Sequence, residues 1–178
     1  MKKLSLLLFS SLLFVSCSSD DSSSDDNNQT PAYAMTASID GADFRANNPF
    51  GNNMFSSTNI WDYFPEEDFV MLQGRSGGVL GNPEINIWLK RSDIEVGTYA
   101  LEPETFSTPS THAIDLTDNS DNEFEYTKDG TIVITAVNTT TKMVTGTFTF
   151  RTVADPNEPT APVTRTITNG TFNYKYEE

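Results

Sequence analysis

Three acidic side chains, Asp118, Asp121 and Glu123, lie close together in the segment DLTDNSDNEFE, which spans residues 115–125. Carboxylate oxygens at such short spacing are ligands that suit calcium. A calcium loop of the EF-hand type that began at Asp118 would need a glycine where Glu123 stands, and a helix on each side. The segment therefore predicts a solvated acidic loop, with a calcium site at these three residues as the alternative.

The stretch Gly74-Arg75-Ser76-Gly77-Gly78 matches the G-x-S-x-G pattern of a serine nucleophile. That pattern works only where a strand ends at the serine and a helix begins there, whereas here Asn82-Pro83 leads into another strand. The only histidine, His112, stands in a Ser/Thr/Pro-rich segment and is expected to be a solvated loop residue. We predict no catalytic residue and no cofactor, and a typical zinc site is excluded because there is no second histidine.

Aromatic side chains are concentrated in the Asn- and Ser-rich stretch NNPFGNNMFSSTNIWDYF, residues 47–64, which does not have the pattern of a regular strand. Aromatic rings in a loop can stack on sugar rings or line a pocket at the open end of a barrel. Trp61, Tyr63 and Phe64 are therefore the predicted ligand-binding residues, with Phe50 and Phe55 as supports. The alternative is that the segment folds back and fills the core with the same rings.

The only cysteine, Cys17, ends a segment with the layout of a secretory signal. Two lysines are followed by an apolar run at residues 4–15, which is too short to span a membrane, and by Ser16. Residues 14–17, FVSC, resemble a bacterial lipobox, with Phe14 where leucine is usual. The resemblance implies that the thiol is lipidated and the new amino terminus carries a fatty acid such as palmitate, which together hold a protein on a membrane. An ordinary secreted protein is the alternative.

Residues 18–31, SSDDSSSDDNNQTP, contain no apolar side chain and predict a solvated tether that, with Cys17, spans 17–31. The sequence Ser18-Ser19-Asp20-Asp21 resembles the acidic export signal of lipoproteins of the Bacteroidetes type, which implies an outward position on the outer membrane. A mere spacer, with the lipid in the periplasmic leaflet, is the alternative. The net charge of −14 becomes −16 without residues 1–16, which contain two lysines and no acid, and this acidity excludes nucleic acid as a partner.

Residues 32–178 are enough for one hydrophobic core and predict a single domain. Apolar and polar residues alternate with a period of two in segments such as EINIWLK, TIVITAV and VTGTFTFR. This pattern predicts an all-β domain of about eight or nine strands, either an antiparallel β-sandwich or a partly open β-barrel. Strands are expected at 34–39, 42–47, 68–75, 84–91, 96–101, 123–127, 131–138, 143–153 and 163–176.

Turn residues lie between these strands. Asp40-Gly41 and the segment 138–142 predict hairpin turns, Asp129-Gly130 is expected to open the strand that follows it, and Asn169-Gly170 predicts a bulge within one long strand. The triplet Gly-Thr-aromatic occurs at 97–99, 146–148 and 170–172. It predicts glycines that ease a bend, with the following ring packed inward or covering the glycine.

Several of these segments occur in a recognisable order: IDGADFRA, GTYAL, DGTIVITAVN, KMVTGTFTFRT and ITNGTFNYKY. In this order, behind a lipobox, they resemble a family of Bacteroidetes lipoproteins known as a domain of unknown function. The likeness covers most of residues 34–176 and is strongest from 128 onward. It implies a small lipid-anchored β-domain and assigns no catalytic or binding residue.

These features predict an outward-facing, lipid-anchored outer-membrane protein. Its β-domain is expected to be a non-catalytic module that binds a glycan, a small apolar ligand or a protein partner. The alternative is an extracellular glycan-active enzyme that uses carboxylates. The adjacent acids Glu66, Glu67 and Asp68 do not support it, because glycoside hydrolysis needs two carboxyl groups that face each other about 5 to 9 Å apart.

Overall fold

The computed structural model describes residues 33–47, 56–64, 67–76, 83–103, 110–118, 123–158 and 160–176; at 47, 56–64, 67–68 and 123–124 it describes the course of the backbone. The described residues form ten strands and one short 3-10 helix, η1 (Arg91–Asp93), which confirms the all-β class. The strands are β1 (Tyr33–Ile39), β2 (Ala42–Asn47), β3 (Ser56–Phe64), β4 (Glu67–Arg75), β5 (Glu84–Lys90), β6 (Gly97–Leu101), β7 (His112–Asp118), β8 (Glu123–Asn138), β9 (Met143–Val153) and β10 (Thr166–Lys175).

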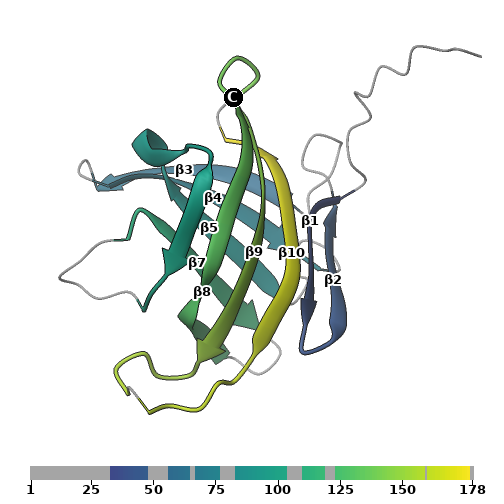
Figure 1. Ribbon diagram of the computed structural model, residues 1–178, viewed down its shortest axis with the longest axis vertical. Coiled ribbons are helices and arrows are strands. Elements are labelled where there is room, and N and C mark those ends of the chain that lie inside the picture. The colour runs from purple at the N-terminus through teal and green to yellow at the C-terminus, as the bar shows by residue number, and fades with distance from the viewer. Residues whose placement is uncertain are drawn as a thin grey trace, which may run out of the picture.

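One antiparallel sheet runs in the order β2-β1-β10-β9-β8-β7-β5-β4-β3, and β6 pairs with β8 outside this path. The long strand β8 joins the two halves of the sheet. It pairs with β9 along one edge, and along the other edge with β7 at residues 123–125 and with β6 at residues 130–134. In Figure 1, β8, β9 and β10 curve across the front while β3, β4 and β5 cross behind them, so that the sheet curls into a nearly closed barrel.

The two halves of the barrel meet where β4 approaches β1 and β2. A Cβ atom on Gly74 would lie 2.9 Å from Met35 Sδ and 3.1 Å from Ala46 Cβ, so the strands pack tightly here and a side chain would require these neighbours to shift. The Tyr174 hydroxyl, from β10, donates a hydrogen bond of 2.8 Å across the interior to the main-chain carbonyl of Gln73. A buried phenol needs such a partner, because leaving it unsatisfied would cost free energy.

Large apolar side chains fill the interior of the barrel. The bulkiest are aromatic, come from β2, β9 and β10, and are at most 2% exposed: Phe44, Phe148, Phe150, Phe172 and Tyr174. The positions that alternate with them on β9 and β10 include Thr147, Thr149 and Thr171, all exposed on the outer face. The two-residue period therefore separates the core from the surface as the sequence predicts.

Glycines and aromatic rings are paired between β9 and β10. Gly146 lies opposite Phe172, and Gly170 lies opposite Phe148. In each pair the ring covers the glycine, because an added Cβ would meet the ring at 2.4 Å. The rings pack inward as predicted, but on these two strands each one covers the glycine of the neighbouring strand and not its own.

Three of the predicted turn features are confirmed. Asp40 and Gly41 have positive φ angles, +50° and +87°, and connect β1 to β2. Asn138 caps the β8–β9 turn, since its Oδ1 accepts the main-chain amides of Thr140 and Thr141. β10 is one strand with a bulge, because its register with β9 shifts between Ile167 and Gly170.

The strands predicted at 34–39, 42–47, 68–75, 84–91, 96–101 and 143–153 are confirmed to within one residue at each end, whereas the remaining strand predictions need correction. β3 and β7 were not expected, because Asn and Ser dilute β propensity in the first and acidic residues obscure the alternation in the second. Residues 123–138 form one strand, so Asp129-Gly130 does not open a new strand. It lies beside a register shift between Thr127 and Asp129, where the strand bulges. The last strand begins at Thr166, and residue 163 lies before it.

Replacing Gly146 with alanine is expected to destabilise the protein by about 1 to 3 kcal/mol, the usual cost of overpacking a core. The new Cβ would lie 2.3 Å from the Val133 carbonyl oxygen as well as against the Phe172 ring, and a backbone atom cannot easily move away. Urea denaturation followed by tryptophan fluorescence measures the effect. Thr147→Ala, at the exposed next position, is the control and should change stability by less than about 0.5 kcal/mol. Equal stabilities for the two variants would contradict the packing argument.

Candidate functional site

The three aromatic residues predicted to bind ligand, Trp61, Tyr63 and Phe64, lie on β3. The expectation that residues 47–64 do not form a regular strand is therefore wrong for residues 56–64. The backbone of Trp61 pairs with that of Phe69 on β4, and the register shifts between Trp61 and Phe64. Phe50 and Phe55 lie outside the described residues. The ligand-binding role of the three aromatic residues stays a prediction.

The acidic residues of the predicted calcium site belong to the β7–β8 connection. Asp118 ends β7, Glu123 begins β8, and the two are register partners on neighbouring strands, while Asp121 lies outside the described residues. Within the described ranges, no three His, Cys, Asp or Glu side chains converge where they could hold a metal ion. Asp118 is instead drawn towards Arg165, whose Nη2 lies 3.9 Å from Asp118 Oδ2.

His112 is not a solvated loop residue, and this expectation is corrected. It begins β7, is only 3% exposed, and stacks on Tyr99 with 3.5 Å between ring centroids. Its Nδ1 lies 2.8 Å from Thr111 Oγ1, and its Nε2 is buried without a hydrogen-bond partner among the described residues. Burial lowers the pKa of His112 below its ordinary value of 6.5, although the carboxylate and main-chain carbonyl of Asp93 act in the opposite direction.

The G-x-S-x-G stretch is described only from Gly74 to Ser76, and residues 77–82 lie outside the described residues. Gly74 lies within β4, and β4 ends at Arg75. The main-chain amide of Ser76 then donates to the carbonyl of Pro83 at 3.2 Å, which directs the chain back to β5 as a hairpin. β4 and β5 pair antiparallel, which agrees with the predicted order of two strands joined by a loop.

A network of polar side chains covers the outer face of β4, β5 and β7. Asn86, which is 6% exposed, donates from Nδ2 to Glu84 Oε1 at 3.0 Å and to Asp115 Oδ1 at 2.9 Å. The side chains of Gln73 and Arg75 also donate hydrogen bonds to Glu84, and the indole N–H of Trp88 donates one to Asp115. All four oxygens of the two carboxylates therefore accept hydrogen bonds from side chains, and the network ties three strands together.

A hollow of about 290 Å³ opens at the end of the barrel where the β1–β2 turn, the start of β5 and the end of β7 meet. Its floor is apolar and its rim carries three carboxylates and one guanidinium. The lining residues are Ile39, Asp40, Ala42, Asp43, Phe44, Pro83, Leu116, Asp118 and Arg165. Its volume is close to the lower limit of about 300 Å³ for small-molecule sites, so a small ligand would fit.

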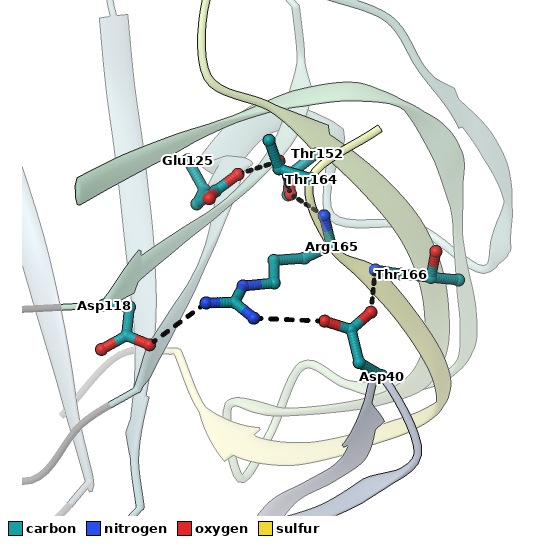
Figure 2. A network of polar contacts seen from close by, with 7 residues as sticks. All are labelled: Asp40, Asp118, Glu125, Thr152, Thr164, Arg165 and Thr166. Atoms are coloured by element: carbon teal, nitrogen blue, oxygen red, sulfur yellow. Dashed lines mark hydrogen bonds and ion pairs between the residues drawn. The ribbon is translucent and has the colours of Figure 1, made fainter. Parts of the chain in front are cut away.

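Arg165 spans this hollow between two elements that are far apart in the sequence (Figure 2). Its Nη1 lies 3.4 Å from Asp40 Oδ2, in addition to the 3.9 Å contact with Asp118. Asp40 is itself held in place, because its other carboxylate oxygen accepts the amide of Thr166 at 2.8 Å and its own amide donates to the Thr166 carbonyl at 2.9 Å. The turn between β1 and β2 is thereby fixed against the start of β10.

The backbone of Arg165 is held from the opposite side by Thr152. The amide of Arg165 donates to Thr152 Oγ1, and its carbonyl accepts the amide of Thr152, at 3.1 and 3.0 Å. Glu125, which is 2% exposed, accepts a hydrogen bond from the Thr164 hydroxyl, and Thr164 also contacts Thr152 (Figure 2). These bonds anchor the main chain that carries Arg165, while its side chain remains 33% exposed.

Residues 33–174 match the family described as "Domain of unknown function (DUF6252)". The chain belongs to the DUF6252 family. The match runs from the first residue of β1 nearly to the end of β10, so the DUF6252 domain is the barrel itself. The predicted likeness to a domain of unknown function is confirmed over this range. No curated protein and no solved structure matches the chain significantly.

The hollow of this DUF6252 domain was only partly foreseeable from the sequence. Asp118 was singled out, but for calcium, and Asp40 was recognised only as a turn residue. Arg165 follows Asp40 by 125 residues, so no local spacing could have connected them.

Among the residues that the structure describes, no helix is long and apolar enough to cross a membrane.

The stability of the DUF6252 domain is expected to fall as the pH drops below about 6.5, in part because of His112. Its folded-state pKa lies below the unfolded value, so in this range the unfolded chain binds more protons than the folded one. Urea denaturation at pH about 7.5 and about 5 should show a larger loss for the wild type than for His112→Gln. The carboxylates contribute the same change in stability to both proteins, so their contribution cancels when the two losses are compared. Parallel losses would show that burial does not oppose protonation of the ring.

Proposed function

We propose that this chain is a lipoprotein of the Bacteroidetes type, anchored in the outer membrane and facing outward, with a β-domain that acts as a non-catalytic binding module. The observation that carries the proposal is Cys17, the only cysteine, placed directly after a signal-like segment. The barrel supports it in one respect. Residues 32–178 contain no cysteine and so no disulfide, and the aromatic core of this domain supplies stability without one.

The distance between Cys17 and the barrel is consistent with an anchored domain. Residues 18–32 separate the cysteine from Tyr33, where β1 begins. Fully extended, these 15 residues reach about 50 Å. The acidic tether and the acidic domain are both repelled by anionic headgroups, which favours a domain held away from the membrane surface.

A binding role fits the arrangement of the barrel better than catalysis does. Side chains occupy the interior, so a ligand would contact the rim or the outside, and the hollow beside Arg165 is a concave surface of suitable size. Glu84 and Asp115 come near each other, as a glycan-active enzyme would require. Their oxygens already accept hydrogen bonds from neighbouring side chains, which favours a structural role for this pair.

Cys17→Ala is expected to release the protein from the membrane fraction, because the variant has no thiol to carry the lipid. Fractionation and immunoblotting measure the release, and labelling with a fatty-acid analogue should fail in the same variant. Retention of the variant in the membrane would contradict the anchor.

Surface exposure is tested separately by adding protease to intact cells, where the wild-type domain should be degraded. Replacing Asp20 and Asp21 with asparagine keeps Cys17 and changes only the acidic segment. If this segment is the export signal, the variant stays membrane-bound but becomes protected from protease. Protection of the wild-type domain would place it in the periplasm.

Trp61→Ala is expected to weaken binding of a glycan or a small apolar ligand by about 1 to 3 kcal/mol and to leave folding intact, because one stacking surface is lost. A glycan array and fluorescence titration measure binding, and thermal denaturation checks the fold. Tyr126→Ala, which removes a 41% exposed ring on β8, is the control and should leave binding unchanged. If Trp61→Ala unfolds the protein, its ring fills the core and the ligand-binding hypothesis falls.

A further inference from the structure

We propose that the hollow at the end of the barrel binds a small organic cation with a short apolar tail, such as an alkylammonium group. The inference rests on the proposed binding function and names the site and the ligand class. It is drawn from the composition of the floor, from the charges on the rim, and from the way in which Arg165 is held.

The floor of the hollow suits an apolar tail. Ile39, Phe44 and Leu116 lie there, contributed by β1, β2 and β7. Phe44 and Leu116 are each 1% exposed, so they are set in the packed core and provide a fixed surface. Because Phe44 and Leu116 expose almost no area, the apolar surface that a tail can cover comes from Ile39, Ala42 and Pro83, and covering it is favourable by about 25 cal/mol per Å². The volume of about 290 Å³ admits a short chain and excludes an extended polymer.

The rim of the hollow selects the sign of the ligand's charge. It carries Asp40, Asp43 and Asp118 against the single cation Arg165. Asp43 is also paired with Arg45 at 2.9 Å, so three carboxylates face two guanidinium groups and one negative charge remains uncompensated. A further cation therefore gains attraction there while an anion meets repulsion. The acidity of the whole chain acts in the same direction and raises the local concentration of cations.

Arg165 can make room for such a ligand without any change in the fold. Its main chain is fixed by Thr152, whereas its guanidinium is one-third exposed and lies 3.9 Å from Asp118, at the limit of an ion pair. An incoming ammonium group that reaches Asp118 therefore displaces only the loosely held end of the side chain. The 3.4 Å contact between Arg165 and Asp40 can persist.

Three probes with the same tail and different charge test this proposal: hexylammonium, hexanol and hexanoate. They are titrated into the mature chain, residues 17–178, carrying Cys17→Ser so that no detergent is needed. The methyl resonances of Ile39 and Leu116 report occupancy in NMR spectra. We expect hexylammonium to bind most tightly, hexanol less tightly and hexanoate least. The preference for hexylammonium should decrease as salt is raised, because screening weakens exposed charge pairs. Equal or tighter binding of hexanoate, or no shift with any probe, would overturn the proposal.

Two variants at the rim sharpen the test. Asp118→Asn should weaken hexylammonium binding about fivefold, and Arg165→Gln should strengthen it by a few-fold, because it removes the competing cation. Glu95→Gln, near the His112 end of β7 and about 20 Å along that strand from Asp118, is the matched control and should leave binding unchanged. Weaker binding in Arg165→Gln would overturn the proposal.

The result of this titration is independent of the anchor. If no probe binds while Cys17→Ala releases the protein from membranes, the proposed ligand class is wrong and the proposed lipid anchor is supported. If hexylammonium binds as expected while Cys17→Ala stays in the membrane, the hollow is confirmed and the anchor fails. Circular dichroism of each variant establishes that it is folded, and the wild-type probe series needs no variant at all.

Discussion

Gly74 on β4 lies so close to Met35 on β1 and Ala46 on β2 that a side chain at that position would require both neighbours to shift. This approach brings the far half of the sheet against the near half and allows the Tyr174 hydroxyl to reach the Gln73 carbonyl. A larger residue at 74 would press on Met35 and Ala46, next to the carbonyl of Gln73 that the buried phenol of Tyr174 needs as its partner. This contact is where the two halves of the barrel meet.

The long strand β8 connects the two halves of the sheet, because it pairs with β7 in one half and with β9 in the other. Its register shifts near Asp129 and again after Ile134 increase the local twist, so the sheet turns a corner without a break in the chain. The ring-over-glycine pairs on β9 and β10 then fill the space on the concave side. Gly146 and Gly170 leave the room that Phe172 and Phe148 occupy.

The hollow at the barrel end is a consequence of the same closure. Asp40 reaches it from the β1–β2 turn and Asp118 from the end of β7, and these two elements face each other only because the sheet curls. Arg165 bridges them, with its main chain tied to Thr152. The polar network around Asn86 is different in kind, because it links adjacent strands and would form in a flat sheet as well.

Period-two alternation, Asp40-Gly41 and Asn169-Gly170 were sufficient to predict an antiparallel β-domain, a hairpin turn and a bulge, because these features depend on neighbouring residues. Local pattern failed at β3 and β7, where Asn, Ser and Asp oppose strand propensity, and at His112, which β6 covers. The sequence by itself determined the class, the acidity and the single cysteine. Only the tertiary structure decided the barrel closure and the meeting of Asp40, Asp118 and Arg165, because contacts between residues so far apart in the chain depend on strand order and curvature, which no local pattern encodes.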